Sequence, residues 1–278
     1  MKFSVVDAHQ HFWIYDPVRD GWMKDMPAIQ RNFLPADFQE LGKNQGITGT
    51  VVVQAAASYE ENDFLLRLAD EHPFIFGVIG WIDMEAEGIE EKLVYYRRFP
   101  KMKGFRNLLQ GEKQRDSMLN PAFLRGIRQL HKYGFSYDLL ILPDQLPFAE
   151  KLVRLLPEQR FVIDHLAKPD IRNGKIGNWH SAIRNFATLQ NVYCKVSGMV
   201  TEADPEYWKE TDFYPYLDVL VDCFGTNRLM FGSDWPVCLA AAEYSEVREI
   251  VVNYFSSFPD ADQAGIFGEN ARRFYQLD

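Results

Sequence analysis

The chain is poor in the features that mark several classes of protein. Its 278 residues include three cysteines, Cys194, Cys223 and Cys238, an odd number without metal-ligand spacing. We therefore expect buried thiols rather than a disulfide framework or a zinc knuckle. No apolar run approaches the roughly 18 residues that cross a bilayer, and no basic segment with a cleavage site precedes the first strand. These absences predict a cytoplasmic protein.

Clusters of basic residues are also absent. The formal net charge is -9, and no tract is rich in Lys and Arg. Nucleic acids and anionic membranes both attract such clusters, so neither is expected as a partner. Small solutes remain as the expected ligands, and the sequence leaves open whether copies of the chain form a homo-oligomer.

Short apolar runs that alternate with helical patterns indicate the fold. The hydrophobic content of 47% is ample for a large core. Runs such as "TGTVVVQA" are continuously apolar, which is typical of strands buried on both faces. The predicted strands are Val5–Phe12, Thr48–Ala55, Phe74–Asp83, Met102–Leu109, Phe135–Leu142, Arg160–Lys168, Val192–Met199 and Arg228–Val237.

Helix signals separate these runs. Ser58 begins a capping-box pattern, "SYEE". Farther along, Asn120, Pro121 and Gly134 are suited to the start and the end of one helix. Eight strand and helix units predict a (β/α)₈ TIM barrel that spans residues 1–278 as one domain. An open doubly wound sheet is less favoured, because no G-x-G-x-x-G loop follows the first strand.

One connection is longer than the others. Residues 13–33, between the first strand and the helix expected near Pro35, exceed the usual length of a βα loop. The segment contains Trp13, Tyr15 and Trp22. Because such loops lie on the catalytic face of a barrel, we expect a lid or substrate wall, with filling of gaps under the loop as the alternative.

The first strand ends in an unusual pair of histidines. In "VVDAHQHFWIYD" the alternation of a strand predicts that Asp7, His9 and His11 share one face, with both imidazoles near the C-terminal mouth of the barrel. Barrel enzymes carry their chemistry at this mouth. A buried, hydrogen-bonded pair of histidines without a catalytic role is the alternative.

Polar residues also stand at the ends of the other predicted strands. Leaving one such group buried without a partner costs about 1 to 3 kcal/mol, so we expect them to converge on one pocket. They are Gln54, Trp81, Asp83, Lys103, Arg106, Tyr137, Asp138, Asp164, His165, Lys168, Lys195, Ser197 and Asp234.

Some of these side chains have plausible structural roles. Arg106 can form an internal ion pair with Asp138 or Asp83 instead of contacting a ligand. For Lys103 and Lys195 we favour an outward orientation, toward the helices around the barrel.

Several motifs in order along the chain resemble a known family. They are "DAHQHFW", "VVVQA", "GVIGWID", "KGFRNLLQ", "VIDHLAKP", "KVSGM", "FGSDWPV" and "GENARRFYQL". Together they resemble the amidohydrolase superfamily, and within it the "amidohydrolase 2" lactonase branch. This branch includes sugar lactonases that act on L-fuconolactone and L-rhamnonolactone.

The resemblance also bears on metal binding. The dinuclear members of the superfamily use a histidine from strand five, and the corresponding run "FSYDLLIL" has none. The resemblance implies one metal site at most, formed by His9, His11, His165 and Asp234 and suited to zinc. Because hydrolysis in the lactonase branch often needs no added metal, the first expectation is that no cofactor is required.

The chemistry of lactone opening suggests catalytic and substrate-binding roles for the polar residues at the strand ends. It needs a base for water, donors for the carbonyl oxygen and a proton for the leaving oxygen. We predict Asp234 as the base, with His165 and Arg106 as catalytic donors. The expected substrate-binding residues are His9, His11, Trp13, Gln54, Asp83, Lys168, Ser197 and Trp235.

The predicted activity is hydrolysis of a neutral sugar lactone, preferably of a 6-deoxy L-sugar. No G-x-S-x-G elbow is present, which disfavours acyl-enzyme chemistry. A metal-dependent decarboxylase or an amide hydrolase of the same superfamily remains an alternative. A non-catalytic sugar-binding barrel is another, because a fold does not by itself define a function.

Overall fold

The protein, seen in a computed structural model that describes residues 3–277, is built around one eight-stranded parallel sheet. The strands follow one another in chain order, so each pairs with its neighbours in the sequence. They are β1 (Val5–Gln10), β2 (Ile47–Val53), β3 (Ile75–Gly80), β4 (Met102–Asn107), β5 (Ser136–Leu139), β6 (Phe161–Ile163), β7 (Val192–Val196) and β8 (Leu229–Phe231).

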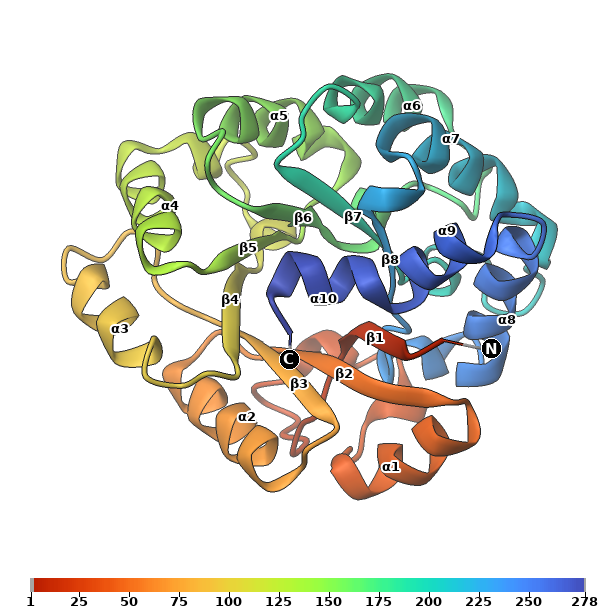
Figure 1. Cartoon of the computed structure of the whole chain (residues 1–278), viewed down its shortest axis with the longest axis horizontal. Helices are drawn as coiled ribbons and strands as arrows, with labels where there is room; N and C mark the ends of the chain where they lie inside the picture. Colours follow the sequence, from red (N-terminus) through yellow and green to blue (C-terminus); the bar gives the residue numbers. More distant parts are fainter. Residues whose placement is uncertain (1–2, 278) are drawn as a thin grey trace.

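Helices follow the strands along the chain, and most of them surround the barrel on the outside (Figure 1). They are α1 (Pro35–Asn44), α2 (Tyr59–Glu71), α3 (Ile89–Tyr96), α4 (Pro121–Tyr133), α5 (Leu146–Leu155), α6 (Gly177–Ile183), α7 (Tyr214–Phe224), α8 (Tyr244–Phe255), α9 (Asp260–Ala264) and α10 (Asn270–Tyr275). Two of the helix signals are confirmed. Ser58 Oγ accepts a hydrogen bond from the Glu61 amide at the start of α2, and Gly134 ends α4 with a φ of 80°.

The barrel closes where β1 meets β8. The Asp234 amide donates to the carbonyl of His9 at 2.8 Å, and the His11 amide donates to the carbonyl of Trp235 at 2.7 Å. These two bonds join the segments that follow both strands, and the predicted (β/α)₈ barrel is confirmed. The closure also brings Asp234 beside the two histidines.

Most strands are shorter than predicted, and the polar residues follow them. β6 ends at Ile163 and β8 at Phe231. After β6, residues 165–168 have φ values between 52° and 58°, and Asp234 has a φ of 58°. Few residues other than glycine adopt this left-handed conformation. His165, Lys168 and Asp234 therefore lie on turns at the strand ends rather than on the strands.

Helix α10 closes the N-terminal end of the barrel, and it crosses the centre of the ring of strands in Figure 1. Phe274, Tyr275 and Leu277 pack with apolar strand residues such as Val6 and Met230. The side chain of Arg160, just before β6, donates to the carbonyl of Phe274. The C-terminal end of the barrel remains as its mouth.

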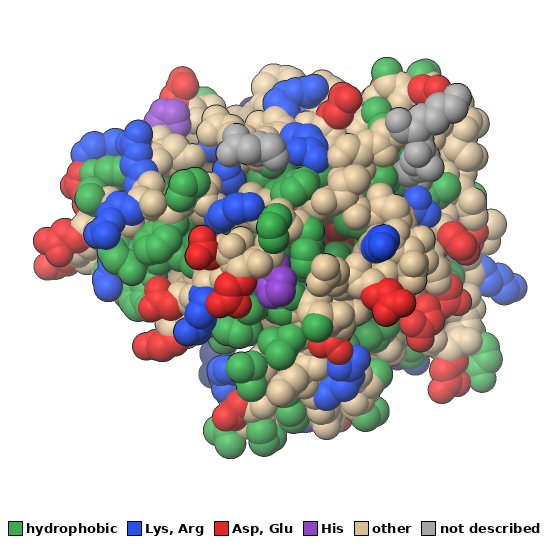
Figure 2. Space-filling model, turned by 60° about the horizontal axis from the view of Figure 1, so that its bottom comes forward, with side chains coloured by type: hydrophobic (Ala, Val, Ile, Leu, Met, Phe, Trp, Pro, Cys, Tyr) green, Lys and Arg blue, Asp and Glu red, His purple; other side chains and the backbone are tan. Residues whose placement is uncertain are grey.

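The exposed surface carries charges of both signs. Figure 2 shows basic and acidic side chains interspersed over one face of the molecule. Among the helices in residues 3–277, none has both the length and the apolar character needed to span a bilayer.

Candidate active site

A break in the register of β1 positions the two histidines. The pairing of β1 with β2 shifts between Asp7 and Gln10, as in a β-bulge. His9 and His11 turn toward each other, with 3.2 Å between their Nε2 atoms. The Nδ1 of His11 lies 2.7 Å from the carbonyl oxygen of Val53 in β2, which orients this ring.

Asp7 does not join the histidines, contrary to the prediction from strand alternation. Its carboxylate accepts hydrogen bonds from the Ser233 amide at 2.9 Å and from the Tyr244 hydroxyl at 3.0 Å. Tyr244 belongs to α8, outside the barrel. The prediction was wrong because the register shift interrupts the period of two. Burial raises the pKa of Asp7 to about 6.

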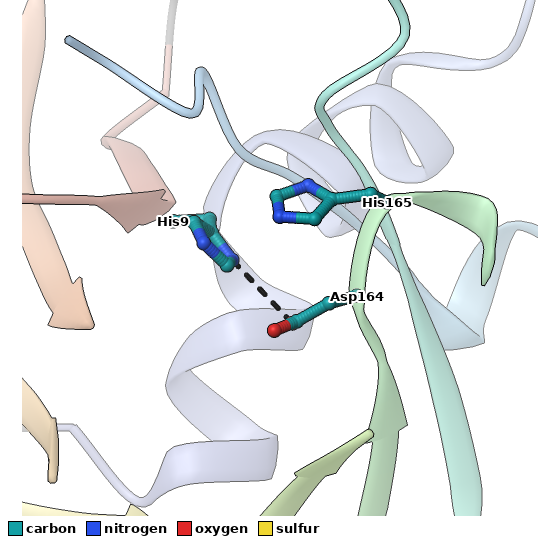
Figure 3. A group of neighbouring side chains, drawn as sticks. All are labelled: His9, Asp164 and His165. Atoms are coloured by element: carbon teal, nitrogen blue, oxygen red, sulfur yellow. Dashed lines mark ion pairs between the residues drawn. The ribbon is translucent and has the colours of Figure 1, made fainter. Parts of the chain in front are cut away.

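His165 faces His9 across the barrel (Figure 3), with 4.3 Å between the ring centroids. Its Nδ1 lies 2.9 Å from the Ser197 hydroxyl. Gly198 leaves room for this ring, because a Cβ there would stand 2.5 Å from Nδ1. Burial lowers the pKa of His165 to about 4, so the ring is neutral at neutral pH.

Arg106 projects from β4 and is held from two sides. Its Nη1 lies 3.0 Å from Asp164 Oδ2, and its Nη2 donates to the carbonyl of Gln54 at 2.5 Å. The Gln54 side chain in turn donates to the carbonyl of Arg106 at 3.1 Å. An ion pair was foreseen as an alternative, but the predicted partners were wrong. Asp138, beside Arg106 in the sheet, pairs with Lys195 instead, and Asp83 lies in a separate depression.

Asp234 occupies the centre of the mouth. Its Oδ1 lies 3.3 Å from His11 Nε2, 3.7 Å from His9 Nε2 and 3.8 Å from His165 Nε2. Burial alone would raise the pKa of Asp234, but attraction to His165 and the other two imidazoles lowers it below its ordinary value. The carboxylate is therefore ionised and can accept a proton.

A fully buried layer of charge lies below the imidazoles. Lys195 contacts Asp138 Oδ2 at 2.6 Å, Asp164 Oδ1 at 3.0 Å and His9 Nδ1 at 3.1 Å. The preferred outward orientation of Lys195 was wrong, since alternation along β7 directs it to the barrel axis. Lys103 instead reaches the α10 end, where it donates to the carbonyl of Gln276.

Burial and the positions of these charges set their pKa values. Burial raises the pKa of Asp138 to about 6. Burial also acts to raise the pKa of Asp164, but Lys195 and His9 lower it well below its ordinary value. Burial and the Lys195 ammonium lower the pKa of His9 well below its ordinary value.

A cavity of about 230 Å³ opens above Asp234. Its polar and charged lining consists of His11, Arg106, Gln110, His165, Lys168 and Asp234. Its other lining residues are Trp13, Trp22, Ala55, Leu108, Gly111, Leu140 and Val237. A mostly apolar wall with a few convergent polar groups is typical of a small-molecule site.

Five predicted substrate-binding residues do not line this cavity, and the first is His9, whose ring lies next to that of His11. Gln54 supports Arg106, and Ser197 contacts His165 from behind. Trp235 is buried against aromatic rings, including Phe33 at 5.2 Å and Phe38 at 5.3 Å between centroids. These placements do not support direct contact with a ligand.

Asp83, the fifth residue, is exposed in a separate depression that it shares with Trp81 and Glu85. It follows the end of β3 by three residues, which is far enough for the chain to leave the mouth.

The loop of residues 13–33 folds back over the mouth. Trp13 and Phe33 exchange two backbone hydrogen bonds, at 2.9 and 3.0 Å. The Trp13 indole donates to the carbonyl of Arg31 and packs edge-on against Trp22, with 6.1 Å between centroids. Both indoles line the cavity, so the loop contributes to its wall.

Three groups that the structure brings to the site were predicted neither as catalytic nor as substrate-binding residues. Asp138, Asp164 and Lys195 form the buried charge layer. Their signal in the sequence was a charged residue inside an otherwise apolar strand run, as in "FVIDHLAKP" and "YCKVSGM". Lys168 lines the cavity as predicted, and its ammonium pairs with Glu202 at 3.2 Å.

The donor set at the mouth fits one divalent metal. His9 Nε2, His11 Nε2 and Asp234 Oδ1 are separated by 3.2, 3.3 and 3.7 Å. Ligands at zinc distances in a tetrahedron are separated by about 3.3 Å. In a neutral His11 the Val53 carbonyl takes the N–H of Nδ1, so Nε2 presents a lone pair to Asp234. A divalent cation held by these residues would stabilise the arrangement.

Comparisons with known proteins relate this site to a family. The sequence model of a protein family described as "Amidohydrolase" matches residues 6–277. An L-fucono-1,5-lactonase from Burkholderia multivorans is 36% identical over 287 residues, which cover 98% of this chain and 96% of that protein. An L-rhamnono-gamma-lactonase from Scheffersomyces stipitis is 28% identical over 163 residues, which cover 52% of this chain and 48% of that protein.

A solved structure agrees with the fold. A crystal structure of an amidohydrolase from Burkholderia multivorans with bound zinc has a TM-score of 0.95 and 36% identity. The match covers 99% of this chain and 100% of that one.

Proposed function

The chain belongs to the amidohydrolase family, and on this premise we propose that it is a hydrolase that opens a sugar-derived lactone to the aldonic acid. The observation that carries the proposal is an ionised carboxylate, Asp234, at the base of a small cavity that Arg106 and His165 also line. The full-length similarity to an L-fucono-1,5-lactonase supports the same substrate class.

The reaction needs three actions at the mouth. Asp234 accepts a proton from water as the water oxygen attacks the lactone carbonyl carbon. Arg106 and His165 donate hydrogen bonds to the carbonyl oxygen, where negative charge develops. When the ring C–O bond breaks, Asp234 returns the proton to the leaving oxygen, and the products are a carboxyl group and a hydroxyl group on one open chain.

The donors are held in place by residues outside the cavity. The Ser197 hydroxyl at Nδ1 of His165 can donate to this nitrogen, which leaves the N–H on Nε2, facing the cavity. Asp164 and Gln54 hold the guanidinium of Arg106. Preorganised donors of this kind stabilise developing charge without first having to reorient.

The lining favours a neutral substrate with an apolar part. Trp13 and Trp22 offer flat apolar faces to a sugar ring, and Leu108 and Leu140 are suited to a methyl group. Within residues 3–277 the charged groups of the lining are Arg106, Lys168 and Asp234, with no second arginine to pair with a dicarboxylate. We therefore place a 6-deoxy L-sugar lactone, such as L-fuconolactone or L-rhamnonolactone, first among substrates.

A metal has a defined place in this scheme. His9, His11 and Asp234 would hold it, with His165 nearby. When bound, a zinc ion polarises a carbonyl and lowers the pKa of water. We propose that lactone opening does not require it, because a lactone carbonyl is more reactive than an amide and Asp234 already supplies the base.

A substrate panel tests the proposal. Aldonolactones, a pyrone or muconate lactone, and aromatic acids are each incubated with the protein, and release of acid or of carbon dioxide is followed. We expect acid from an aldonolactone. Preference for the pyrone or muconate lactone would overturn the substrate assignment, carbon dioxide release would indicate a decarboxylase, and binding without turnover would indicate a sugar-binding protein.

A further inference from the structure

Lys195 contacts Nδ1 of the His9 ring, on the side away from the mouth. The Lys195 ammonium is fully buried and lies 3.1 Å from His9 Nδ1. Its contacts with oxygen atoms are Asp138 Oδ2 and Asp164 Oδ1, both of carboxylates, and the Tyr275 ring lies 5.5 Å away. An ammonium has three donors and no acceptor. Next to it, the Nδ1 of a neutral His9 must accept, and the proton of the ring stands on Nε2.

At the other nitrogen of His9, Arg106 Nη1 lies 3.4 Å from Nε2 and favours a lone pair there, whereas His11 favours an N–H. His11 Nδ1 faces the Val53 carbonyl at 2.7 Å, and a carbonyl only accepts, so Nε2 of a neutral His11 is an acceptor. His9 Nε2 lies 3.2 Å from it and donates its N–H. In this state His9 has no lone pair directed at the mouth, and the site lacks one of its metal ligands.

Asp164 favours the other tautomer of His9, with the proton on Nδ1. Its Oδ1 lies 3.4 Å from His9 Nδ1. This oxygen is fully buried, and the Lys195 ammonium is its ion-pair partner at 3.0 Å. A carboxylate oxygen can accept from more than one donor, and an N–H on Nδ1 of His9 would be a second donor to it. The His9 proton then lies on Nδ1, and the lone pair of Nε2 faces His11 and Asp234.

We propose that Lys195 and Asp164 compete for Nδ1 of His9 and thereby set the affinity of the mouth for a divalent metal. Lys195 lowers this affinity and Asp164 raises it. The exchange moves one proton from Nε2 to Nδ1 of the same ring and takes none from solvent. Both are positioning residues, since neither contacts the metal. The inference rests on the proposed metal ligands and does not depend on the substrate being a lactone.

Zinc affinity is the first measurement. The metal-free protein competes for zinc with a chromophoric chelator, and the dissociation constant is obtained for each variant. We expect Lys195→Met to bind zinc about tenfold more tightly and Asp164→Asn about 10- to 100-fold more weakly, as for other groups that orient a metal-ligating histidine. Unchanged or weaker binding by Lys195→Met, or unchanged binding by Asp164→Asn, would overturn the proposal.

A matched control separates the hydrogen bond from the loss of a positive charge. Lys168→Met removes a lysine that lines the cavity above the buried charges and pairs with Glu202. We expect its zinc affinity to stay within about twofold of wild type, since it leaves the His9 hydrogen bonds intact. A gain in zinc affinity equal to that of Lys195→Met would show that charge alone is responsible and would overturn the proposal.

The tautomer of His9 is the second measurement. Two-bond ¹H–¹⁵N spectra of histidine-labelled, metal-free protein distinguish an N–H on Nδ1 from one on Nε2, and the His9→Gln variant assigns the signals. We expect Nε2–H in the wild type and Nδ1–H in Lys195→Met. The same tautomer in both proteins would overturn the proposal.

A double variant keeps the proposal testable if Lys195→Met does not fold. Lys195→Met leaves Asp138 without its ammonium partner, so the double variant Lys195→Met/Asp138→Asn removes both charges. It should show the same gain in zinc affinity and the same shift of tautomer, and the absence of both changes would overturn the inference.

Failure of this inference is distinguishable from failure of the proposed function. If lactones are hydrolysed but neither the wild type nor Lys195→Met binds zinc, the inference is wrong and the function stands. If the expected order of zinc affinities is found without lactone hydrolysis, the inference stands and the function is wrong.

Discussion

The two ends of the barrel use the same strands for different purposes. At the N-terminal end, Phe274 and Leu277 of the C-terminal segment pack against the strands in an apolar plug. At the mouth, His11, His165 and Asp234 surround a cavity. Each strand thus begins in a packed core and ends in polar groups. The residues that stabilise the fold and the residues suited to catalysis therefore lie at opposite ends of the barrel axis, as in other barrels of this type.

The layer between the two ends carries charge without contact to solvent. Tyr275 of the plug donates a hydrogen bond to Asp138 at 2.9 Å, and Lys195 connects Asp138 to His9 at the mouth. Breaking a buried ion pair by removing one partner leaves an uncompensated charge. We interpret this layer as the support that holds His9 in a fixed position.

The largest effect is expected at the mouth. Asp234→Asn should reduce kcat/KM for lactone hydrolysis by a factor on the order of 10² to 10⁴, because an amide cannot accept the proton of water. The melting temperature should stay close to that of the wild type. Steady-state kinetics and thermal unfolding measure the two quantities.

The control for this variant is Asp83→Asn, which changes an exposed carboxylate outside the cavity. It should keep kcat/KM within about twofold of wild type, as expected for a surface substitution. Near wild-type turnover by Asp234→Asn would exclude Asp234 as the base.

A substitution in the apolar plug should lower stability and leave the catalytic rate unchanged, which is the reverse of the result expected for Asp234→Asn. Phe274→Ala removes a buried ring that packs against Tyr193 and Tyr275, and we expect it to lower the free energy of unfolding by about 3 to 5 kcal/mol. The kcat of the folded fraction should stay near wild type. Urea denaturation and kinetics check both, with Tyr207→Ala, at a side chain that is 75% exposed, as the control. A loss of kcat without a loss of stability would contradict the separation of the two ends.

The pH dependence of the free energy of unfolding tests the buried carboxyl group of Asp7, which lies outside both the cavity and the plug. Burial raises the pKa of Asp7 from 3.8 to about 6, so the folded chain holds this proton more tightly than the unfolded chain does. Ionisation of Asp7 therefore costs stability as the pH rises from about 4 to 6, on the order of 3 kcal/mol when complete. Below the unfolded pKa the cost is absent.

Asp7→Asn should remove this cost. Compared with wild type, the variant should gain free energy of unfolding between pH 4 and about 7, as measured by urea denaturation across this range. Asp25→Asn, at an exposed carboxylate, should instead run parallel to wild type. A difference between Asp7→Asn and wild type that does not change with pH would show that Asp7 titrates normally.

Metal removal should have the smallest effect. We expect exhaustive chelation to leave most of kcat/KM in place, because Asp234 and the donors Arg106 and His165 remain. Kinetics are measured beside elemental analysis before and after chelation. A loss of activity in proportion to the zinc or manganese removed, restored when the metal is returned, would show that His9 and His11 serve as ligands of a required metal.

The mouth of the barrel could be predicted to a large extent. Continuous apolar runs identified the strands, and residues such as His11, Arg106, His165 and Asp234 at their ends line one cavity. Neighbouring strand ends meet in any closed parallel barrel, so a position at a strand end was enough to bring these residues together.

The errors occurred where the chain departs from regular geometry. A register shift in β1 separates Asp7 from the histidines. Left-handed residues after β6 and β8 turn the chain, and the side chain of Trp235 packs into the core instead of facing the cavity. The direction of Lys195 depended on which face of β7 points inward, and a continuously apolar strand does not reveal this face.

The sequence by itself determined the eight alternating units, the expected barrel and the set of polar groups at the strand ends, because strand and helix periods and turn residues are local properties. Only the tertiary structure decided which polar groups face one another. The contacts of Lys195 with Asp138, Asp164 and His9 join three other strands or strand ends, separated by 57, 31 and 186 residues. No local pattern specifies such distances, since they follow from the closure of the barrel and from the bulge and turns that direct each side chain.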